Sequence, residues 1–390
     1  MALAPRQVRP TLLREMNERA IFEYICTHGP TTRAELTRKL GMSAPAASRA
    51  VANLLKAGLM EAAGSRKSAS AGRPGTSYAL ASGQSYVLGA TIGLTRCTVV
   101  AAGLDGVYAD NTVESFVTPN SYADLISAIT MTARRVISAR PGKPLGLGIS
   151  VPGQIDRRNR TVMMSPNLHI LDGQAVETDL KRLLKIRCSM FHETDCACMA
   201  ELSFGAARGM DDFALVSLYE GFGVSAISSG NLLAGHQGLA GEIGHCTVDR
   251  PGKLCGCGNR GCLETVATDV ALASAVSSRV GRRLDIDEVI RRSHEGKMDV
   301  RRELEQLLDF LAVGVGIVVN ALNPQAVLLC GRLYDLDKDA LNRLRNKTSR
   351  HALTPLLRDC QIIRAQGSTL KGAIACIIQS ITDTLGPAMP

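Results

Sequence analysis

The segment 241–264 constrains the fold of this chain more than any other, because it contains one histidine and three cysteines at short spacings. Nine residues separate His245 from Cys255, one separates Cys255 from Cys257, and four separate Cys257 from Cys262. Thiolates and a neutral imidazole are ligands that zinc prefers, and four of them complete a tetrahedral shell. Glycines between the cysteines allow tight turns, because they adopt positive φ without a Cβ clash. The pattern predicts a structural zinc site, whereas the alternative is a loop with free, buried cysteines.

Two carboxylates, Glu242 and Glu264, flank this zinc knot. Glu242 and His245 are three residues apart, so on a helical turn they share a face. Held by the metal, they could present hydrogen-bond acceptors to a polar ligand such as a sugar. A solvated surface pair without a ligand explains the spacing equally well.

The chain has 390 residues, enough for two or three domains with a substantial core. The N-terminus lacks the apolar core of a signal peptide, and the apolar stretch 310–322 is too short to span a bilayer. We therefore expect a cytoplasmic protein without a membrane partner, whose cysteines stay reduced. Six cysteines in apolar surroundings are expected to be small core residues, namely Cys26, Cys97, Cys188, Cys330, Cys360 and Cys376.

The positive charge is concentrated at the N-terminus. Residues 1–80 contain 12 Lys and Arg but 5 Asp and Glu, so they carry +7 of the +9 net charge. A basic module on a nearly neutral body is typical of a nucleic-acid reader joined to a second domain.

The same residues have the pattern of a winged helix-turn-helix. Apolar spacing predicts helices over 12–27 and 33–40, and Ser43 can cap a third helix that ends near Ala57. Two short strands follow, at 59–62 and 76–80, with a flexible basic loop between them that we interpret as a wing. The order helix, helix, short turn, helix matches a helix-turn-helix.

Double-stranded DNA is the predicted partner of this module. Small residues at the start of the third helix allow close approach to the major groove, and the basic wing suits phosphate or minor-groove contact. The predicted DNA-binding residues are Ser43, Ala44, Pro45, Ala47, Ser48 and Arg49 on the helix and Arg66, Lys67 and Arg73 on the wing. The alternative is a three-helix protein-interaction domain with a solvated basic loop.

After a short linker at 81–85, strands alternate with helices to the end of the chain, which predicts an α/β body over 86–390. Strand pairs with a glycine in the turn occur twice, at 86–103 and 213–229, and suggest two similar lobes around a cleft. Long helices are expected near 265–280, 301–322, 338–353 and 369–385.

Specific motifs recur in the body: Gly-Glu-Ile-Gly-His at 241–245, Cys-Gly-Cys-Gly-Asn-Arg-Gly-Cys-Leu-Glu at 255–264, Val-Pro-Gly at 151–153, Ser-Pro-Asn-Leu at 165–168 and Met-Ala-Glu-Leu-Ser-Phe-Gly at 199–205. With these motifs the chain resembles the ROK family (repressors, open reading frames, kinases), and in particular its winged-helix regulators of sugar metabolism. The resemblance covers nearly the whole chain. It implies a two-lobed, actin-like sugar-kinase (ribonuclease H-like) fold.

The resemblance also implies ligands. Zinc would be bound by His245, Cys255, Cys257 and Cys262, and the sugar-binding residues would be Gly153, Asn167, His192, Glu193, Glu242, His245 and Glu264. The ligand would be a sugar or a sugar phosphate.

Departures from the ROK kinases argue against an enzyme. Their Asp-x-Gly-Gly-Thr phosphate turn reads Thr-Ile-Gly-Leu-Thr at 91–95, and their Gly-Thr-Gly loop has Phe222 in place of Thr. Their catalytic Asn-Asp pair falls on His192 and Glu193. The extra methylene of Glu displaces the carboxylate, and misplacement of that size can cost ~100-fold in rate. Asp195 takes the place of the carboxylate only if the register shifts by two.

We therefore expect a sugar-responsive regulator of transcription, a repressor, that acts as a homodimer or homotetramer on an inverted-repeat operator. One alternative is an ATP-dependent sugar kinase that also binds DNA. Another is a regulator whose body no longer binds sugar and senses a partner protein instead.

Overall fold

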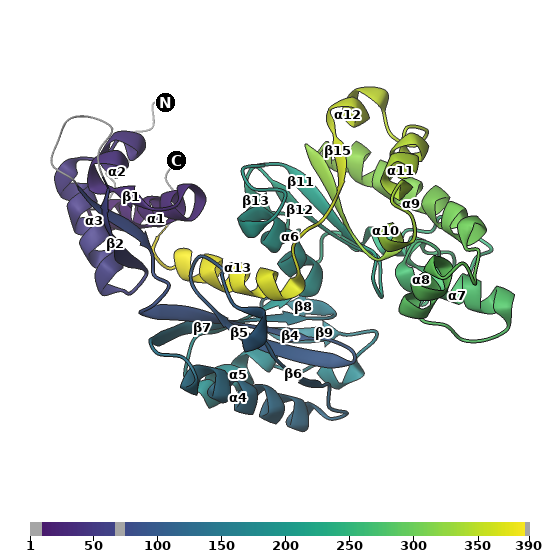
Figure 1. The fold of residues 1–390 in the computed structure, drawn as a ribbon, viewed down its shortest axis with the longest axis horizontal. Coiled ribbons are helices and arrows are strands. Elements are labelled where there is room, and N and C mark those ends of the chain that lie inside the picture. Colours follow the sequence, from purple (N-terminus) through teal and green to yellow (C-terminus); the bar gives the residue numbers. More distant parts are fainter. Residues whose placement is uncertain (1–9, 67–74, 387–390) are drawn as a thin grey trace, which may run out of the picture.

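The computed structural model describes residues 10–66 and 75–386 and shows an N-terminal module beside two lobes (Figure 1). The N-terminal module consists of α1 (Pro10–His28), β1 (Thr31–Thr32), α2 (Arg33–Leu40), α3 (Ala44–Lys56), β2 (Met60–Arg66) and β3 (Gly75–Leu80). Its three strands form an antiparallel sheet in the order β1-β3-β2. This is a winged helix, as the sequence predicts.

Capping residues explain where the second and third helices of this module begin. Thr32 and Glu35 form a capping box at the start of α2, in which each side chain bonds the backbone N–H of the other residue. Ser43 caps α3 by accepting a hydrogen bond from the Ala46 N–H at 3.4 Å. Gly41 ends α2 in the left-handed conformation (φ 64°), which produces the tight turn between the two helices.

Each lobe is built on a five-stranded sheet. The first sheet has the order β10-β7-β4-β5-β6 and the second the order β13-β12-β11-β14-β15. The strands are β4 (Ser85–Ile92), β5 (Arg96–Ala102), β6 (Glu114–Val117), β7 (Lys143–Val151), β10 (Cys188–His192), β11 (Phe213–Ser217), β12 (Gly223–Ser228), β13 (Asn231–Leu232), β14 (Ala326–Cys330) and β15 (Gln361–Arg364). In both sheets three antiparallel strands continue into two parallel ones. The α/β class and the two similar lobes are thus confirmed.

Alternation along β4 divides the first lobe into two cores. Tyr86 and Leu88 face α4 (Tyr122–Ser138) and α5 (Val176–Leu184), whereas Val87 faces the opposite side. A β-strand points successive side chains to opposite faces, so both faces of this strand are covered.

The opposite face of the first sheet carries α13 (Thr369–Thr382), which also packs along α6 (Glu193–Phe204) (Figure 1). Glycine makes this close approach possible. A Cβ on Gly148 of β7 would lie 2.0 Å from the carbonyl oxygen of Ala373.

The second lobe contains most of the remaining helices, namely α7 (Asp269–Val280), α8 (Ile286–His294), α9 (Arg301–Leu322), α10 (Leu333–Leu336), α11 (Ala340–Thr348) and α12 (Thr354–Asp359). In the described part of the chain, α9 is the one helix that is long and apolar enough to cross a membrane by length and composition. One side of this helix, with Leu308, Leu311 and Val315, is fully buried in the core of the lobe. It is therefore the central helix of a folded lobe.

An apolar cluster joins the winged helix to the first lobe. Ile21 and Phe22 of α1 belong to the same buried cluster as Val100 of β5 and Ile374 of α13. At its edge the Arg19 guanidinium lies 3.2 Å from the Asp383 carboxylate.

The prediction that Cys26 is a core residue is wrong, because it lies on the exposed side of α1, one position beyond the buried Ile25.

Candidate functional site

A cleft of about 2060 Å³ runs between the two lobes and reaches the winged helix. All seven residues predicted to bind sugar line it: Gly153, Asn167, His192, Glu193, Glu242, His245 and Glu264. They come from the first lobe, from the start of α6 and from the segment 241–264 that contains the histidine and three cysteines. The fold thus brings together side chains that are up to 111 positions apart in the sequence, from 153 to 264.

The histidine and three cysteines of the knot segment form a compact cluster. One ligand atom from each of His245, Cys255, Cys257 and Cys262 lies within 4.8 Å of the others. The Cys257 and Cys262 sulfurs are 3.7 Å apart, and the Cys255 sulfur is 3.6 Å from Nδ1 of His245. Four ligands at the usual zinc–sulfur distance of about 2.3 Å would be separated by ~3.8 Å on a tetrahedron. Donor types and spacing therefore fit zinc.

Two glycines allow the knot to fold this tightly. Gly241 and Gly261 both have positive φ, of 96° and 70°. A Cβ on Gly261 would lie 1.5 Å from the carbonyl oxygen of Asp249, and one on Gly241 would lie 1.9 Å from that of Val224. Larger residues are excluded at both positions, so the sequence requires glycine there.

The two flanking carboxylates have different surroundings. Glu242 lies in a short 3-10 turn, and its carboxylate is 3.6 Å from Nε2 of His245. Glu264 accepts a hydrogen bond from the Phe222 N–H at 3.2 Å, and the Cys255 thiol lies 3.7 Å from its other oxygen. His245 thus turns Nδ1 to the cysteines and Nε2 toward the carboxylate of Glu242. This arrangement leaves Nε2 on the cleft side of the cluster.

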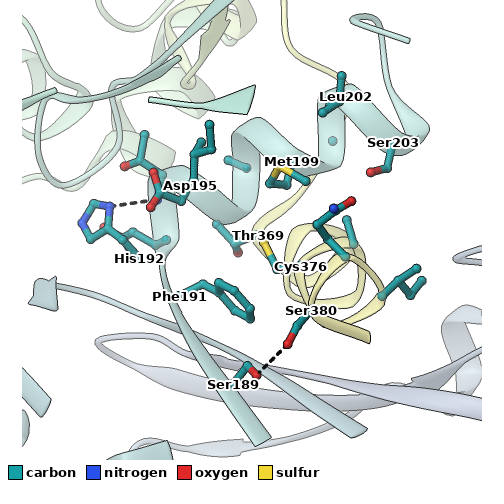
Figure 2. A pocket seen from close by; sticks show the side chains of 18 of the residues that line it. Ser189, Phe191, His192, Asp195, Met199, Leu202, Ser203, Thr369, Cys376 and Ser380 are labelled. Atoms are coloured by element: carbon teal, nitrogen blue, oxygen red, sulfur yellow. Dashed lines mark hydrogen bonds between the residues drawn. The ribbon is translucent and has the colours of Figure 1, made fainter. Parts of the chain in front are cut away.

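The start of α6 brings further polar groups to the cleft (Figure 2). His192 caps the helix, with Nδ1 accepting from the Thr194 N–H at 3.4 Å. Asp195 accepts from the Ser225 hydroxyl at 2.8 Å and from the Arg157 guanidinium at 3.1 Å. In the sequence, Asp195 matches the catalytic carboxylate of the kinases only if the register shifts by two. No sequence signal pointed to Arg157.

Burial changes the acid–base properties of two of these groups. It raises the pKa of the Glu193 carboxyl to about 7, with a smaller contribution from the negative charge of Glu220. Burial also lowers the pKa of His192, although Asp195 and Glu242 oppose this effect. The imidazole of His192 is therefore neutral at neutral pH.

Gly153 and Asn167 form the first-lobe wall. Gly153 follows β7 with φ of 106°, and a Cβ there would lie 2.4 Å from the carbonyl oxygen of Met164. Asn167 is exposed, in the turn after β9 (Thr161–Met164). An exposed amide at the rim of a cleft is available to a ligand hydroxyl.

The parts that ROK kinases use for phosphates have other contacts here. The Thr91 hydroxyl hydrogen-bonds the Thr98 hydroxyl on the neighbouring strand, and the Gly93 N–H donates to the Arg96 carbonyl at 3.1 Å. Phe222 is buried in the core of the second lobe. These groups are therefore engaged within the protein.

On the winged helix, the start of α3 is exposed at Ser43, Ala44, Pro45 and Arg49, and Ser48 is half-buried. The prediction that Ala47 lies on this surface is wrong, since its side chain is fully buried. Ala47 begins the apolar stripe that continues through Val51 and Leu54, at helical spacing. The side chain of Arg66 and the whole of Lys67 and Arg73 lie outside the described residues.

Comparison with known proteins agrees with this organisation. Residues 87–379 match the ROK family, and residues 16–69 match the MarR family. The xylose repressor of Bacillus subtilis is 24% identical over 389 residues, which cover 96% of this chain and 98% of the repressor. The transcriptional dual regulator NagC of Escherichia coli is 23% identical over 375 residues, which cover 91% of this chain and 90% of NagC.

Solved structures show the same fold. A ROK family transcriptional regulator, described as a homolog of the E. coli MLC protein, superimposes with a TM-score of 0.83 at 20% identity and covers 96% of this chain and 98% of its own. A ROK family glucokinase from Streptomyces griseus, in complex with glucose and AMPPNP, superimposes with a TM-score of 0.67 and covers 77% of this chain and 99% of its own. Because the family pattern extends over most of its length, this chain belongs to the ROK family.

Proposed function

We propose that the protein is a sugar-responsive, DNA-binding repressor of carbohydrate-metabolism genes. The observation that carries the proposal is the combination, in one chain, of a basic winged helix with a cleft lined by polar side chains from both lobes. Relatives that align over almost their whole length are named as repressors, among them those for xylose and N-acetylglucosamine.

In this proposal the sugar binds between the first-lobe wall, at Gly153 and Asn167, and the side chains of Glu242, His245 and Glu264. His192 and Glu193 complete the site from α6. Carboxylates accept hydrogen bonds from sugar hydroxyls, and an imidazole whose Nδ1 is bound by a metal donates through its Nε2–H to a hydroxyl oxygen. Zinc on the knot would be structural, and it would hold His245 with Nε2 facing the ligand.

The exposed start of α3 would enter the major groove, with Ser48 and Arg49 contacting bases or phosphates, and the wing residues Arg66, Lys67 and Arg73 would contact the backbone. A single short helix reads few base pairs, so we propose a homodimer or homotetramer on an inverted-repeat operator. A sugar then changes operator affinity only as far as it prefers one of two lobe arrangements.

Titration of the purified protein onto DNA fragments flanking its own gene, with and without a sugar panel, tests this function. We expect a specific complex whose affinity changes with one sugar, and Arg49→Ala should weaken it. Scrambling one half-site should weaken binding if the operator is symmetric. Absence of a specific complex with every fragment would overturn the proposal, and ATP turnover would then be measured.

A further inference from the structure

The chain crosses between the two lobes twice, and both crossings meet at the sequence motif 199–205. Residues 205–212 lead from α6 into β11 of the second lobe, and residues 365–368 lead from β15 back to α13 on the first sheet. The helices α6 and α13 pack along each other at this place (Figure 2). Two lobes that are joined by two adjacent segments can rotate about them as a hinge.

The fully buried carboxylate of Glu201 holds the two crossings together. One of its oxygens accepts a hydrogen bond from the Ala206 N–H at 2.8 Å, and the other accepts from the N–H groups of Gln366 and Gly367. Hydrogen bonds from backbone N–H groups to a carboxylate are stronger than neutral ones. A Cβ on Gly205 would lie 2.2 Å from this carboxylate, so the crossing needs glycine there. The axis of a lobe rotation therefore passes close to Glu201.

Beyond Glu201, the first crossing is anchored to the second lobe. The Asp211 carbonyl accepts from the Gly230 N–H at 2.9 Å, and the Asp212 carbonyl accepts from the Gln325 N–H at 2.8 Å. Arg208 lies between Glu201 and these anchors, and its side chain is exposed. Its guanidinium stands off the hinge axis by the length of a long side chain, so it is displaced when the second lobe rotates.

The winged helix is instead held by the first lobe. The Arg19 guanidinium of α1 pairs with the Asp383 carboxylate at the end of α13, at 3.2 Å. The Leu104 N–H of the first lobe donates to the Ala81 carbonyl at 3.2 Å, and the Ala81 N–H donates to the Leu59 carbonyl at 3.1 Å. These bonds add to the apolar cluster that α1 shares with β5 and α13. The winged helix therefore moves with the first lobe.

Arg208 connects these two sides, because its guanidinium donates to the Thr27 carbonyl at 3.1 Å. Thr27 lies in the last turn of α1, where backbone carbonyls lack donors within the helix and carry the negative end of its dipole. A guanidinium, which is always charged, is a suitable partner for them. Because a hydrogen bond is lost beyond about 3.5 Å, a displacement on the order of 1 Å breaks this contact.

We infer that the bond between Arg208 and Thr27 is a latch between the second lobe and the winged helix, and that rotation of the lobes about Glu201 opens it. The inference rests on the proposed function and adds the route from the sugar to the winged helix. The cleft, at about 2060 Å³, exceeds the roughly 300–1,000 Å³ typical of small-ligand sites, so enclosing a sugar requires the lobes to close. Closure breaks the latch, and the latch therefore opposes sugar binding.

Calorimetry and operator titration with the full-length protein test the latch by comparing Arg208→Ala with Arg134→Ala. Arg134 is a matched control, since its exposed guanidinium donates to the Leu183 carbonyl at 3.0 Å within the first lobe. The probes are xylose, glucose and N-acetylglucosamine. We expect Arg208→Ala to bind the preferred sugar about fivefold more tightly than the parent, because closure no longer breaks a bond. The effect of that sugar on operator affinity should shrink by a similar factor, whereas Arg134→Ala should match the parent.

The outcomes separate the latch from the proposed function. Sugar affinity in Arg208→Ala that is equal to or weaker than in the parent overturns the latch and leaves a regulator in place. If none of the three sugars binds, the sugar response fails, and operator affinity without sugar decides: an unchanged value in Arg208→Ala overturns the latch. If no specific DNA complex forms either, the proposed function fails and the inference fails with it.

Hydrogen exchange tests the hinge without any ligand. In the parent, the N–H groups of Ala206, Gln366 and Gly367 should exchange slowly, and Glu201→Gln should accelerate all three, because an amide offers one acceptor oxygen in place of two. The winged helix should keep its protection in this variant, which shows that the chain is folded. Unchanged exchange at the three groups would overturn the role of Glu201 in the hinge.

Discussion

The Glu264 carboxylate accepts a hydrogen bond from the backbone N–H of Phe222 at 3.2 Å, which ties the knot to the loop between β11 and β12. Replacing Glu264 with alanine removes this tie and one proposed sugar acceptor. We expect sugar affinity to fall by at least ~10-fold, because a buried donor is left unpaired and a ligand contact is lost. Calorimetry measures this, with Glu114→Ala as a surface control, and unchanged affinity in Glu264→Ala would remove this residue from the site.

Zinc content is the second prediction. We expect about one equivalent per chain, and Cys257→Ser should lower it and abolish the sugar response, since three remaining ligands no longer close the shell. Metal analysis and DNA titration with sugar measure the two effects. Cys246→Ser is the matched control, because Cys246 is exposed and stands outside the four-residue cluster. A full sugar response from metal-free Cys257→Ser would contradict a structural role for the ion.

The third prediction concerns pH. Burial raises the pKa of Asp269 to about 7, and one of its oxygens has no hydrogen-bond partner. The folded state therefore holds this proton when the unfolded chain has already lost it, so the contribution of Asp269 to stability falls as pH rises from about 4 to about 7. Asp269→Asn removes that loss and retains an acceptor for the Arg332 N–H.

Relative to the parent protein, Asp269→Asn should gain on the order of 2–3 kcal/mol in unfolding free energy between pH 5 and pH 8. Urea unfolding at both pH values measures the difference. Asp110→Asn, on an exposed turn, should show no such gain. A difference for Asp269→Asn that does not vary with pH would show that this carboxyl titrates normally.

The fourth prediction separates the two kinds of residue at the start of α3. Arg49 is exposed, so Arg49→Ala should lower operator affinity by about tenfold without changing the melting temperature. Ala47 is fully buried, so Ala47→Leu should overpack the winged helix and cost about 1–3 kcal/mol in stability. Fluorescence anisotropy with labelled operator and thermal unfolding distinguish the two effects. Equal operator affinity for Arg49→Ala and the parent would place the DNA contact elsewhere.

The sequence predicted local features well, because they depend on neighbours in the chain. Ser43 caps α3 as predicted, and the spacing of His245 and the three cysteines predicted their clustering. The nine-residue, strongly charged α8 and the four-residue β6 were missed, since neither has a long apolar period.

Long-range contacts could not be predicted in this way. The bond from Phe222 to Glu264 joins residues 42 positions apart, and Arg157 meets Asp195 across 38. The prediction that Ala47 is exposed was wrong because a small residue fits either face of a helix. Only the packing around it decides which face is buried. The charge balance of the cleft likewise depends on which cations the fold pairs internally.

The packing of the winged helix against the first lobe has a consequence for biosynthesis. The winged helix comes first in the chain, but α13, which completes its apolar contact with the first lobe, comes after both lobes. Domains fold from the N-terminal side as the chain emerges from the ribosome. The winged helix can therefore fold early, but it can dock onto the first lobe only after α13 has been synthesised, which requires translation to pass Thr382. Under the proposed function, a nascent chain would thus carry a folded winged helix that is not yet controlled by sugar.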